Sequence, residues 1–101
     1  MARFDLFRLS GDQGYVVDVQ SDHVSALVQT RVVVPLIRLD VLGKPISNLN
    51  PVLCIEGHEY AFVAQSLTTL TVPEMGLRVA SLMNEHGDTF TCALEFLLAG
   101  F

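Results

Sequence analysis

The sequence predicts a mainly β (α+β) fold, a twisted antiparallel sheet of about five strands that carries one C-terminal α-helix. Short apolar runs rich in β-branched residues, separated by turn-forming residues, occupy the first two thirds of the chain. The apolar spacing changes to a helical period after Gly76. A length of 101 residues, of which 50% are hydrophobic, suits a single domain at 1–101 with one core.

The first three strands follow from alternation and turn chemistry. Residues 2–9 alternate in polarity, the turn-forming stretch 10–14 follows, and 14–20 continues as the antiparallel return of a hairpin. Residues 30–36 (TRVVVPL) predict a third strand. We expect Pro35 at the end of that strand, because proline has no N–H to donate to the ladder.

The middle of the chain predicts a loop and then a second hairpin. Glycine, proline and asparagine mark 39–50 as a loop, with a possible short strand at 38–42. The runs 52–55 and 60–64 form the hairpin, and between them lies a tight turn around Glu56, Gly57 and His58.

Two further segments lead to the helix. Residues 66–72 predict another extended segment, which Pro73 stops. Residues 77–83 fit either a strand or a helical turn, and their spacing does not separate these alternatives.

The C-terminal helix begins at Asn84 or Asp88 by its apolar spacing. Helical periodicity places six apolar side chains within about 140° of one another. This stripe, which we expect to face the sheet, consists of Phe90, Ala93, Leu94, Leu97, Leu98 and Phe101. Gly100 suits a left-handed residue at the helix end, after which Phe101 would pack back toward Phe96 or Glu95.

The opposite side of this helix is less polar than an exposed face should be. Helical spacing places there Asp88, Cys92, Glu95, Phe96 and Ala99. An exposed face that is apolar in this way usually marks a contact with another chain. Charged residues make up only 17% of the sequence, which also favours a partner or a homodimer.

The charge pattern disfavours direct binding to nucleic acid. The net charge is −5, and the six basic residues form no run: Arg3, Arg8, Arg31, Arg38, Lys44 and Arg78. Phosphate backbones require clustered cations. No apolar run is long enough to span a bilayer, and the N-terminus lacks the apolar core of a signal peptide. We therefore expect no membrane association and a cytoplasmic location.

Cysteines and histidines predict no metal, cofactor or catalytic site. We expect Cys54 and Cys92 to be reduced, buried thiols, because free cysteine packs as a small hydrophobic residue. The three histidines lie in unrelated contexts. His86 and Asp88 come closest to metal-ligand spacing, but capping or solvation explains that pair better.

Four stretches together resemble the CcdB family of toxins from bacterial toxin–antitoxin modules. They are DVQSD at 18–22, RVVVPL at 31–36, PVLCIEG at 51–57 and ALEFLLAGF at 93–101. The likeness extends from Phe4 to Phe101. It implies a homodimer with an SH3-like barrel, a small additional sheet and a long C-terminal helix.

The resemblance also implies a function. Members of the family are not enzymes; they bind the A subunit of DNA gyrase and trap the gyrase–DNA cleavage complex. A CcdA-like antitoxin neutralises them, and the toxin–antitoxin complex represses transcription of its own operon. The antitoxin contacts that the resemblance suggests are the loop at 8–14 and the surface near 38–46.

The family pattern implies a gyrase-binding surface drawn from two segments. Its residues are Ser21, His23, Val24, Glu95, Ala99, Gly100 and Phe101. Four of these positions depart from the best-known pattern: Ala99 replaces a tryptophan, Glu95 an asparagine and Phe101 an isoleucine, and His23 stands where an aliphatic residue is commoner. Glu95 and Ala99 are one helical turn apart, so they share the outer helix face identified above.

Two alternatives to a gyrase poison remain open. A dimer of the same fold with weakened or lost gyrase poisoning would act as an antitoxin-binding co-repressor, and the departures at Glu95 and Ala99 motivate this alternative. An endoribonuclease is the other, since related toxins on this fold cleave RNA. The acidic charge and the dispersed basic residues disfavour it.

Overall fold

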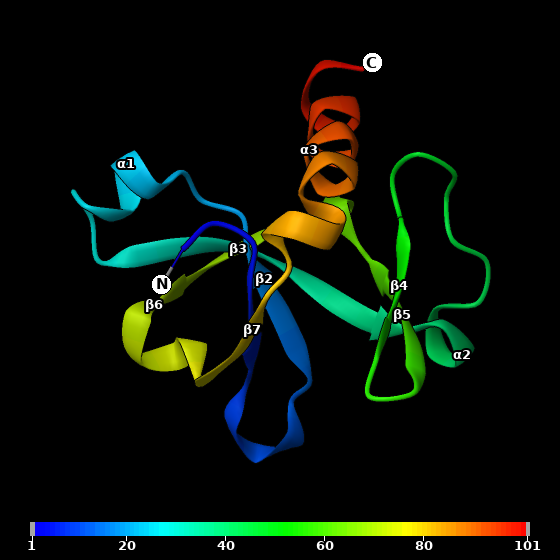
Figure 1. Ribbon diagram of the computed structural model, residues 1–101, viewed down its shortest axis with the longest axis horizontal. Coiled ribbons are helices and arrows are strands. Elements are labelled where there is room, and N and C mark those ends of the chain that lie inside the picture. The colour runs from blue at the N-terminus through cyan, green and yellow to red at the C-terminus, as the bar shows by residue number, and fades with distance from the viewer. Residues whose placement is uncertain (1, 101) are drawn as a thin grey trace.

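The computed structural model describes residues 2–100 and confirms a mainly antiparallel β architecture with one long C-terminal helix (Figure 1). The seven strands are β1 (Asp5–Arg8), β2 (Tyr15–Asp18), β3 (Thr30–Arg38), β4 (Val52–Ile55), β5 (His58–Phe62), β6 (Thr68–Thr71) and β7 (Leu77–Ser81). The helices are α1 (Asp22–Ser25), α2 (Leu39–Leu42) and α3 (Met83–Ala99), with 3-10 turns at Ser10–Asp12, Ala64–Ser66 and Val72–Met75.

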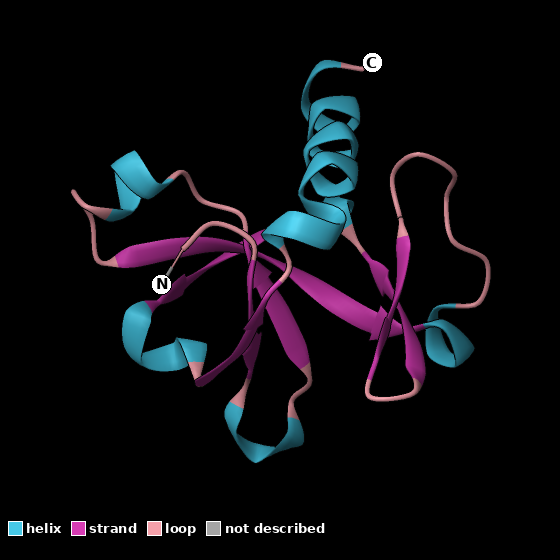
Figure 2. Cartoon of the chain, viewed as in Figure 1, coloured by secondary structure: helices cyan, strands magenta, loops and turns pink. Residues whose placement is uncertain are grey.

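Strand β3 organises the sheet, because it is long enough to serve two sets of neighbours. Its first half pairs with β6, and its last three residues pair with β5. The order β6-β3-β2-β1-β7 therefore forms a curled five-stranded unit, while the β4–β5 hairpin branches from the end of β3 (Figure 2). This arrangement confirms the expected twisted antiparallel sheet with one C-terminal helix; the β4–β5 pair, expected as a small additional sheet, is continuous with the rest through β3 in one seven-stranded sheet.

Pro35 lies inside β3, so the expectation that it ends the strand was wrong. It pairs with Val16 of β2, and its carbonyl accepts the N–H of Val63 on the other side. The proline nitrogen faces that same side, where the β6 pairing has ended at Val33 and the β5 pairing begins at Leu36. No ladder bond is lost, because the nitrogen falls in the gap between two partner strands.

Two uncertain segments are resolved by the structure. The possible separate strand at 38–42 is absent: Arg38 is the last residue of β3, and residues 39–42 turn through α2. Arg38 pairs with Asp40 at 2.9 Å, and the Gly43 N–H donates to the Leu39 carbonyl. Gly43 has φ +86°, a conformation that suits glycine and closes the turn. Residues 77–81 form strand β7, paired with β1.

The main core lies between α3 and the concave side of the sheet. The Phe90 ring stacks on Phe62 with ring centroids 4.1 Å apart and meets Phe4 edge-on. Phe90, Ala93 and Leu94 are buried as the helical stripe predicts, but Leu98 is 75% exposed. The prediction for Leu98 was wrong because α3 extends beyond the sheet at its C-terminal end (Figure 1). Phe101 lies outside the described residues.

Both cysteines are exposed, contrary to the expected burial. Cys54 lies on β4 between the buried Leu53 and Ile55, so strand alternation points its thiol to the opposite face. Cys92 lies on the outer face of α3, where helical periodicity had placed it. Among the described residues, no helix is long and apolar enough to cross a membrane.

Candidate partner-binding site

Helix α3 presents the exposed side of its C-terminal half in a defined orientation. The helix ends at Gly100, which has φ 82° and ψ 18° and donates its N–H to the Phe96 carbonyl at 3.0 Å. This left-handed ending confirms the predicted role of Gly100. Glu95, Phe96, Leu98 and Ala99 are all exposed here, so the outer-face residues are accessible to a partner.

A groove on one side of α3 connects the helix to the sheet. This sheet-side groove has a volume of about 500 Å³ and a mainly apolar lining. Its lining residues are Arg3, Val19, Gln20, Val32, Leu67, Thr91, Leu94, Glu95, Leu98 and Ala99. Two of the predicted gyrase-binding residues, Glu95 and Ala99, thus lie beside the Val19–Gln20 segment that precedes Ser21.

The other predicted residues lie on a separate projection. Ser21, His23 and Val24 are exposed on or next to α1, and they do not line the sheet-side groove. The Ser21 hydroxyl accepts the His23 N–H at 3.2 Å and so caps α1. Figure 1 shows α1 and the end of α3 projecting from the sheet as separate elements.

Gln20 holds the α1 segment to the sheet, a role that sequence reasoning missed. Its side-chain nitrogen donates to the Ser25 hydroxyl at 3.0 Å and to the Thr30 carbonyl at 2.9 Å, and its oxygen accepts the Val32 N–H. Through these hydrogen bonds Gln20 joins the start of the 20–32 segment to Ser25 and to the first residues of β3. The sequence signal that could have indicated this role is the polar Gln20 directly after an alternating strand.

Asp18 and Arg31 form a buried pair beneath this segment. The guanidinium Nε lies 3.9 Å from the Asp18 carboxylate, and both side chains are at least nine-tenths buried. Burial raises the pKa of Asp18 above its ordinary value, while the Gln20 N–H and the Arg31 charge oppose that shift. Neither residue lines a groove beside α3, so we assign the pair a structural role in supporting the site.

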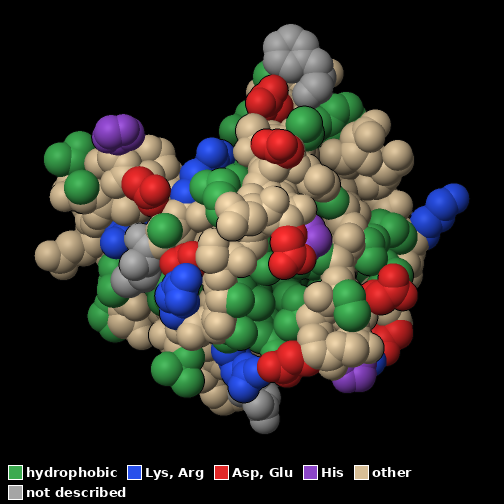
Figure 3. Space-filling model, in the orientation of Figure 1, with side chains coloured by type: hydrophobic (Ala, Val, Ile, Leu, Met, Phe, Trp, Pro, Cys, Tyr) green, Lys and Arg blue, Asp and Glu red, His purple; other side chains and the backbone are tan. Residues whose placement is uncertain are grey.

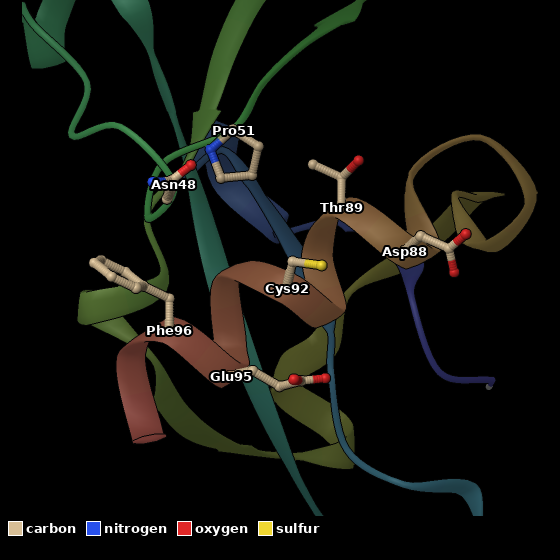
Figure 4. A pocket seen from close by; sticks show the side chains of 7 residues that line it. All are labelled: Asn48, Pro51, Asp88, Thr89, Cys92, Glu95 and Phe96. Atoms are coloured by element: carbon tan, nitrogen blue, oxygen red, sulfur yellow. The ribbon is translucent and has the colours of Figure 1, made fainter. Parts of the chain in front are cut away.

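A larger groove lies on the other side of α3, against the 43–51 loop (Figure 4). This loop-side groove has a volume of about 800 Å³. It is lined by Asn48, Pro51, Asp88, Thr89, Cys92, Glu95 and Phe96. Glu95 therefore contributes to both grooves, whereas Ala99 contributes to the sheet-side groove alone.

The loop side of this groove was not predictable from the helix pattern. Asn50, which is buried, anchors the loop: its side chain donates to the Gln65 side chain at 2.7 Å and accepts the Ile46 N–H at 3.0 Å. Asn48 adopts φ +68°, which asparagine tolerates. The asparagine-rich loop composition predicted a turn, but its position against α3 depends on contacts with β5 and the following turn.

Most basic side chains of the described residues are engaged within the fold. Four of the six basic side chains pair with carboxylates: Arg8 with Glu56, Arg31 with Asp18, Arg38 with Asp40 and Arg78 with Asp5. Within residues 2–100, no three histidine, cysteine or acidic side chains converge as a metal site. Apolar grooves flanking an exposed helix remain the principal surface features.

Comparisons with known proteins agree with this fold. A search of curated protein sequences returns no match. Two solved structures are similar, each with a TM-score of 0.76 and 14% identity, a likeness that shows the fold. One is an endoribonuclease in complex with its cognate antitoxin, from mycobacterial species, with 97% of this chain and 94% of that chain covered. The other is an endoribonuclease from mycobacterial species, with 97% and 90% covered. The family model described as CcdB protein matches residues 3–100.

Proposed function

Because the chain belongs to the CcdB protein family, we propose that it is the toxin of a toxin–antitoxin module, that an antitoxin neutralises it, and that it acts by binding the A subunit of DNA gyrase. In this function the protein is a homodimer that binds gyrase while DNA is cleaved and prevents the break from closing. It works as a ligand for gyrase and has no catalytic step of its own.

The observation that carries this proposal is the end of α3. The helix leaves the sheet with Glu95, Ala99 and Gly100 exposed, at the positions where the family resemblance implies gyrase contacts. A rigid helix with a left-handed glycine cap binds without first being ordered, which reduces the entropy lost on association. The exposed Ser21, His23 and Val24 provide a second contact region on α1.

An endoribonuclease is the second candidate, since both structurally similar proteins carry that description. RNA cleavage requires cations for the phosphate backbone and an acid–base pair at the scissile bond. Here Arg31 and Arg78 hold the buried carboxylates of Asp18 and Asp5. If these arginines bound RNA instead, the buried carboxylates of Asp18 and Asp5 would lose their cations, which is energetically costly and favours the gyrase-binding proposal.

Plasmid cleavage by gyrase tests the proposal directly. The purified protein is incubated with gyrase from the source species, supercoiled plasmid and ATP, and linear DNA is scored after the enzyme is denatured. We expect linear product that increases with toxin concentration and disappears when the antitoxin is added. A parallel incubation with cellular RNA and a chelator distinguishes the candidates: RNA cleavage without linear DNA would replace gyrase binding with ribonuclease activity.

A further inference from the structure

The loop-side groove combines an apolar lining with two carboxylates that lack an internal partner. Asp88 and Glu95 form no ion pair or side-chain hydrogen bond with any described residue. Other carboxylates are engaged within the fold, namely Asp5, Asp18, Asp22, Asp40, Glu56 and Glu74. No lysine or arginine lines this groove. Its negative potential is therefore uncompensated.

We propose that the loop-side groove binds a segment of the antitoxin that carries two cationic side chains with an apolar side chain between them. This inference rests on the proposed toxin function and specifies the chemistry of its neutralising partner. The apolar side chain would lie against Pro51, Cys92 and Phe96. The cationic side chains would reach Asp88 and Glu95, so the segment complements both the shape and the charge of the groove.

The geometry of the groove supports this division of roles. In Figure 4 the Asp88 and Glu95 carboxylates point away from the Phe96 ring, while Asn48 and Pro51 close the opposite wall. The Phe96 side chain is 37% exposed and so offers apolar area to a ligand. On the face shown in Figure 3, acidic side chains lie over α3. A cationic segment would meet a favourable potential as it approaches this face.

The helix spacing sets the spacing of the two cations. Asp88 and Glu95 are seven residues apart, which corresponds to about 10 Å along the axis at a rise of 1.5 Å per residue. An extended segment presents the side chains of i, i+2 and i+4 on one face, with about 13 Å between i and i+4, which the long side chains of lysine and arginine can adjust to about 10 Å; a helical segment requires about seven residues. The antitoxin segment should therefore carry lysine or arginine at i and i+4 with the apolar residue at i+2 if extended, or lysine or arginine at i and i+7 if helical.

A second copy of the chain fits this groove less well. A two-fold symmetric contact places the same patch of both copies in one interface. Asp88 and Glu95 of one copy would then lie close to the same carboxylates of the other, and no cation in the groove would offset their repulsion. The same acidic charges disfavour a nucleic acid as the occupant.

Affinity measurements on the full-length toxin test the proposal. Asp88→Asn and Glu95→Gln keep the side-chain shapes and remove the charges, and Glu59→Gln is the matched control. Glu59 is also an exposed carboxylate without an internal partner, but it lies on β5, outside both grooves of α3. We expect the double variant to bind the antitoxin at least about ten-fold more weakly at low salt, with a smaller difference at high salt.

A charge swap distinguishes direct contact from a general effect of net charge. Glu95→Lys should weaken antitoxin binding further, and replacing one cationic residue of the antitoxin segment by glutamate should restore it. Restoration requires the two side chains to meet. If the double variant binds like the unmodified toxin, or if Glu59→Gln weakens binding equally, the proposal is overturned.

The two exposed cysteines report on occupancy without any substitution. Cys92 lies in the loop-side groove and Cys54 lies outside it on β4. We expect the antitoxin to slow alkylation of Cys92 by a maleimide at least about ten-fold, as followed by mass spectrometry, since a bound segment excludes the reagent. Cys54 serves as the internal control. Protection of Cys92 in the toxin alone would assign the groove to a second copy and overturn the antitoxin as occupant.

Failure of this inference is distinguishable from failure of the proposed function. A toxin that neither traps gyrase nor binds the antitoxin overturns both. A toxin that traps gyrase and binds the antitoxin independently of Asp88 and Glu95 overturns only the assignment of the groove. If the double variant keeps its antitoxin affinity and loses gyrase trapping, the groove belongs to gyrase and the antitoxin assignment falls.

Discussion

The rings of Phe62 and Phe90 stack with 7° between their planes, and this contact joins α3 to the sheet. Both side chains are completely buried. Because Phe90 also meets Phe4, one side chain connects β5, the N-terminal segment and the helix. The position of every α3 residue that a partner would contact depends on this aromatic cluster.

Phe90→Ala should therefore destabilise the fold by about 3–5 kcal/mol, because it removes a buried ring and leaves a cavity. Urea denaturation followed by circular dichroism measures the change. Phe96→Ala is the control: that side chain is 37% exposed, so its removal should cost less than about 1 kcal/mol. Equal losses for the two variants would contradict the assignment of Phe96 to the surface.

The pair of Asp18 and Arg31 predicts a pH-dependent effect. Arg31→Met leaves Asp18 as a buried charge without its cation and should cost about 3–5 kcal/mol at pH 7. Burial already raises the pKa of Asp18. In the folded variant that pKa would rise further above the unfolded value, so the folded state binds the proton more tightly and stability is lost as pH increases through the raised pKa.

The stability deficit of Arg31→Met should accordingly shrink as the pH is lowered from 8 toward 5. Denaturation midpoints across that range measure it. Arg38→Met provides the comparison, because Arg38 pairs with Asp40 on the surface and its loss should cost less than about 1 kcal/mol at every pH. A deficit for Arg31→Met that does not change with pH would exclude Asp18 as its cause.

Gly76 illustrates a backbone requirement at the start of β7. Its φ is +76°, and an added Cβ would overlap the carbonyl oxygen of Arg8. Gly76→Ala should cost at least about 3 kcal/mol, whereas Gly57→Ala should cost about 1–2 kcal/mol, since Gly57 has a similar φ but open space around it. Thermal or urea unfolding compares them; a smaller loss at Gly76 would show that β1 can shift to admit the methyl group.

The sequence predicted the elements whose signals are local. Alternation and helical spacing located the hairpins and α3, and Gly100 marked the helix end. Pro35 was misjudged because its effect depends on which strands lie beside β3, and that pairing is not local. Burial of Leu98 was predicted wrongly for a related reason: periodicity gives the face of a helix, but not where the sheet beneath it ends.

The site was predictable only in part for the same physical reason. Periodicity placed Cys92, Glu95 and Ala99 on one exposed face of α3. The grooves on either side require Gln20 and Asn50, whose side chains tie loops to distant strands. Such contacts join residues far apart in sequence, and no pattern within a single segment records them.

Glu95→Ala and Phe101→Ala should separate binding from folding. Glu95 is exposed, so its loss should change the free energy of unfolding by less than about 0.5 kcal/mol. Both variants should require more protein than the unmodified chain to give the same yield of linear plasmid. Unfolding midpoints measured on the same preparations are the control. A large loss of stability in either variant would place that residue in the core and remove it from the proposed interface.

Ala99→Trp should strengthen the interaction with gyrase. Ala99 is exposed at the rim of the sheet-side groove, so a larger side chain fits without disturbing the core. A central tryptophan is worth about 2 kcal/mol or more in an interface, which is roughly 30-fold in affinity. We expect half-maximal plasmid linearisation at a correspondingly lower protein concentration. Glu85→Trp adds a tryptophan at another exposed position, near the other end of α3, and should leave that concentration unchanged. If both variants gain equally, the effect is nonspecific adhesion, and if Ala99→Trp gains nothing, gyrase does not contact this end of the helix.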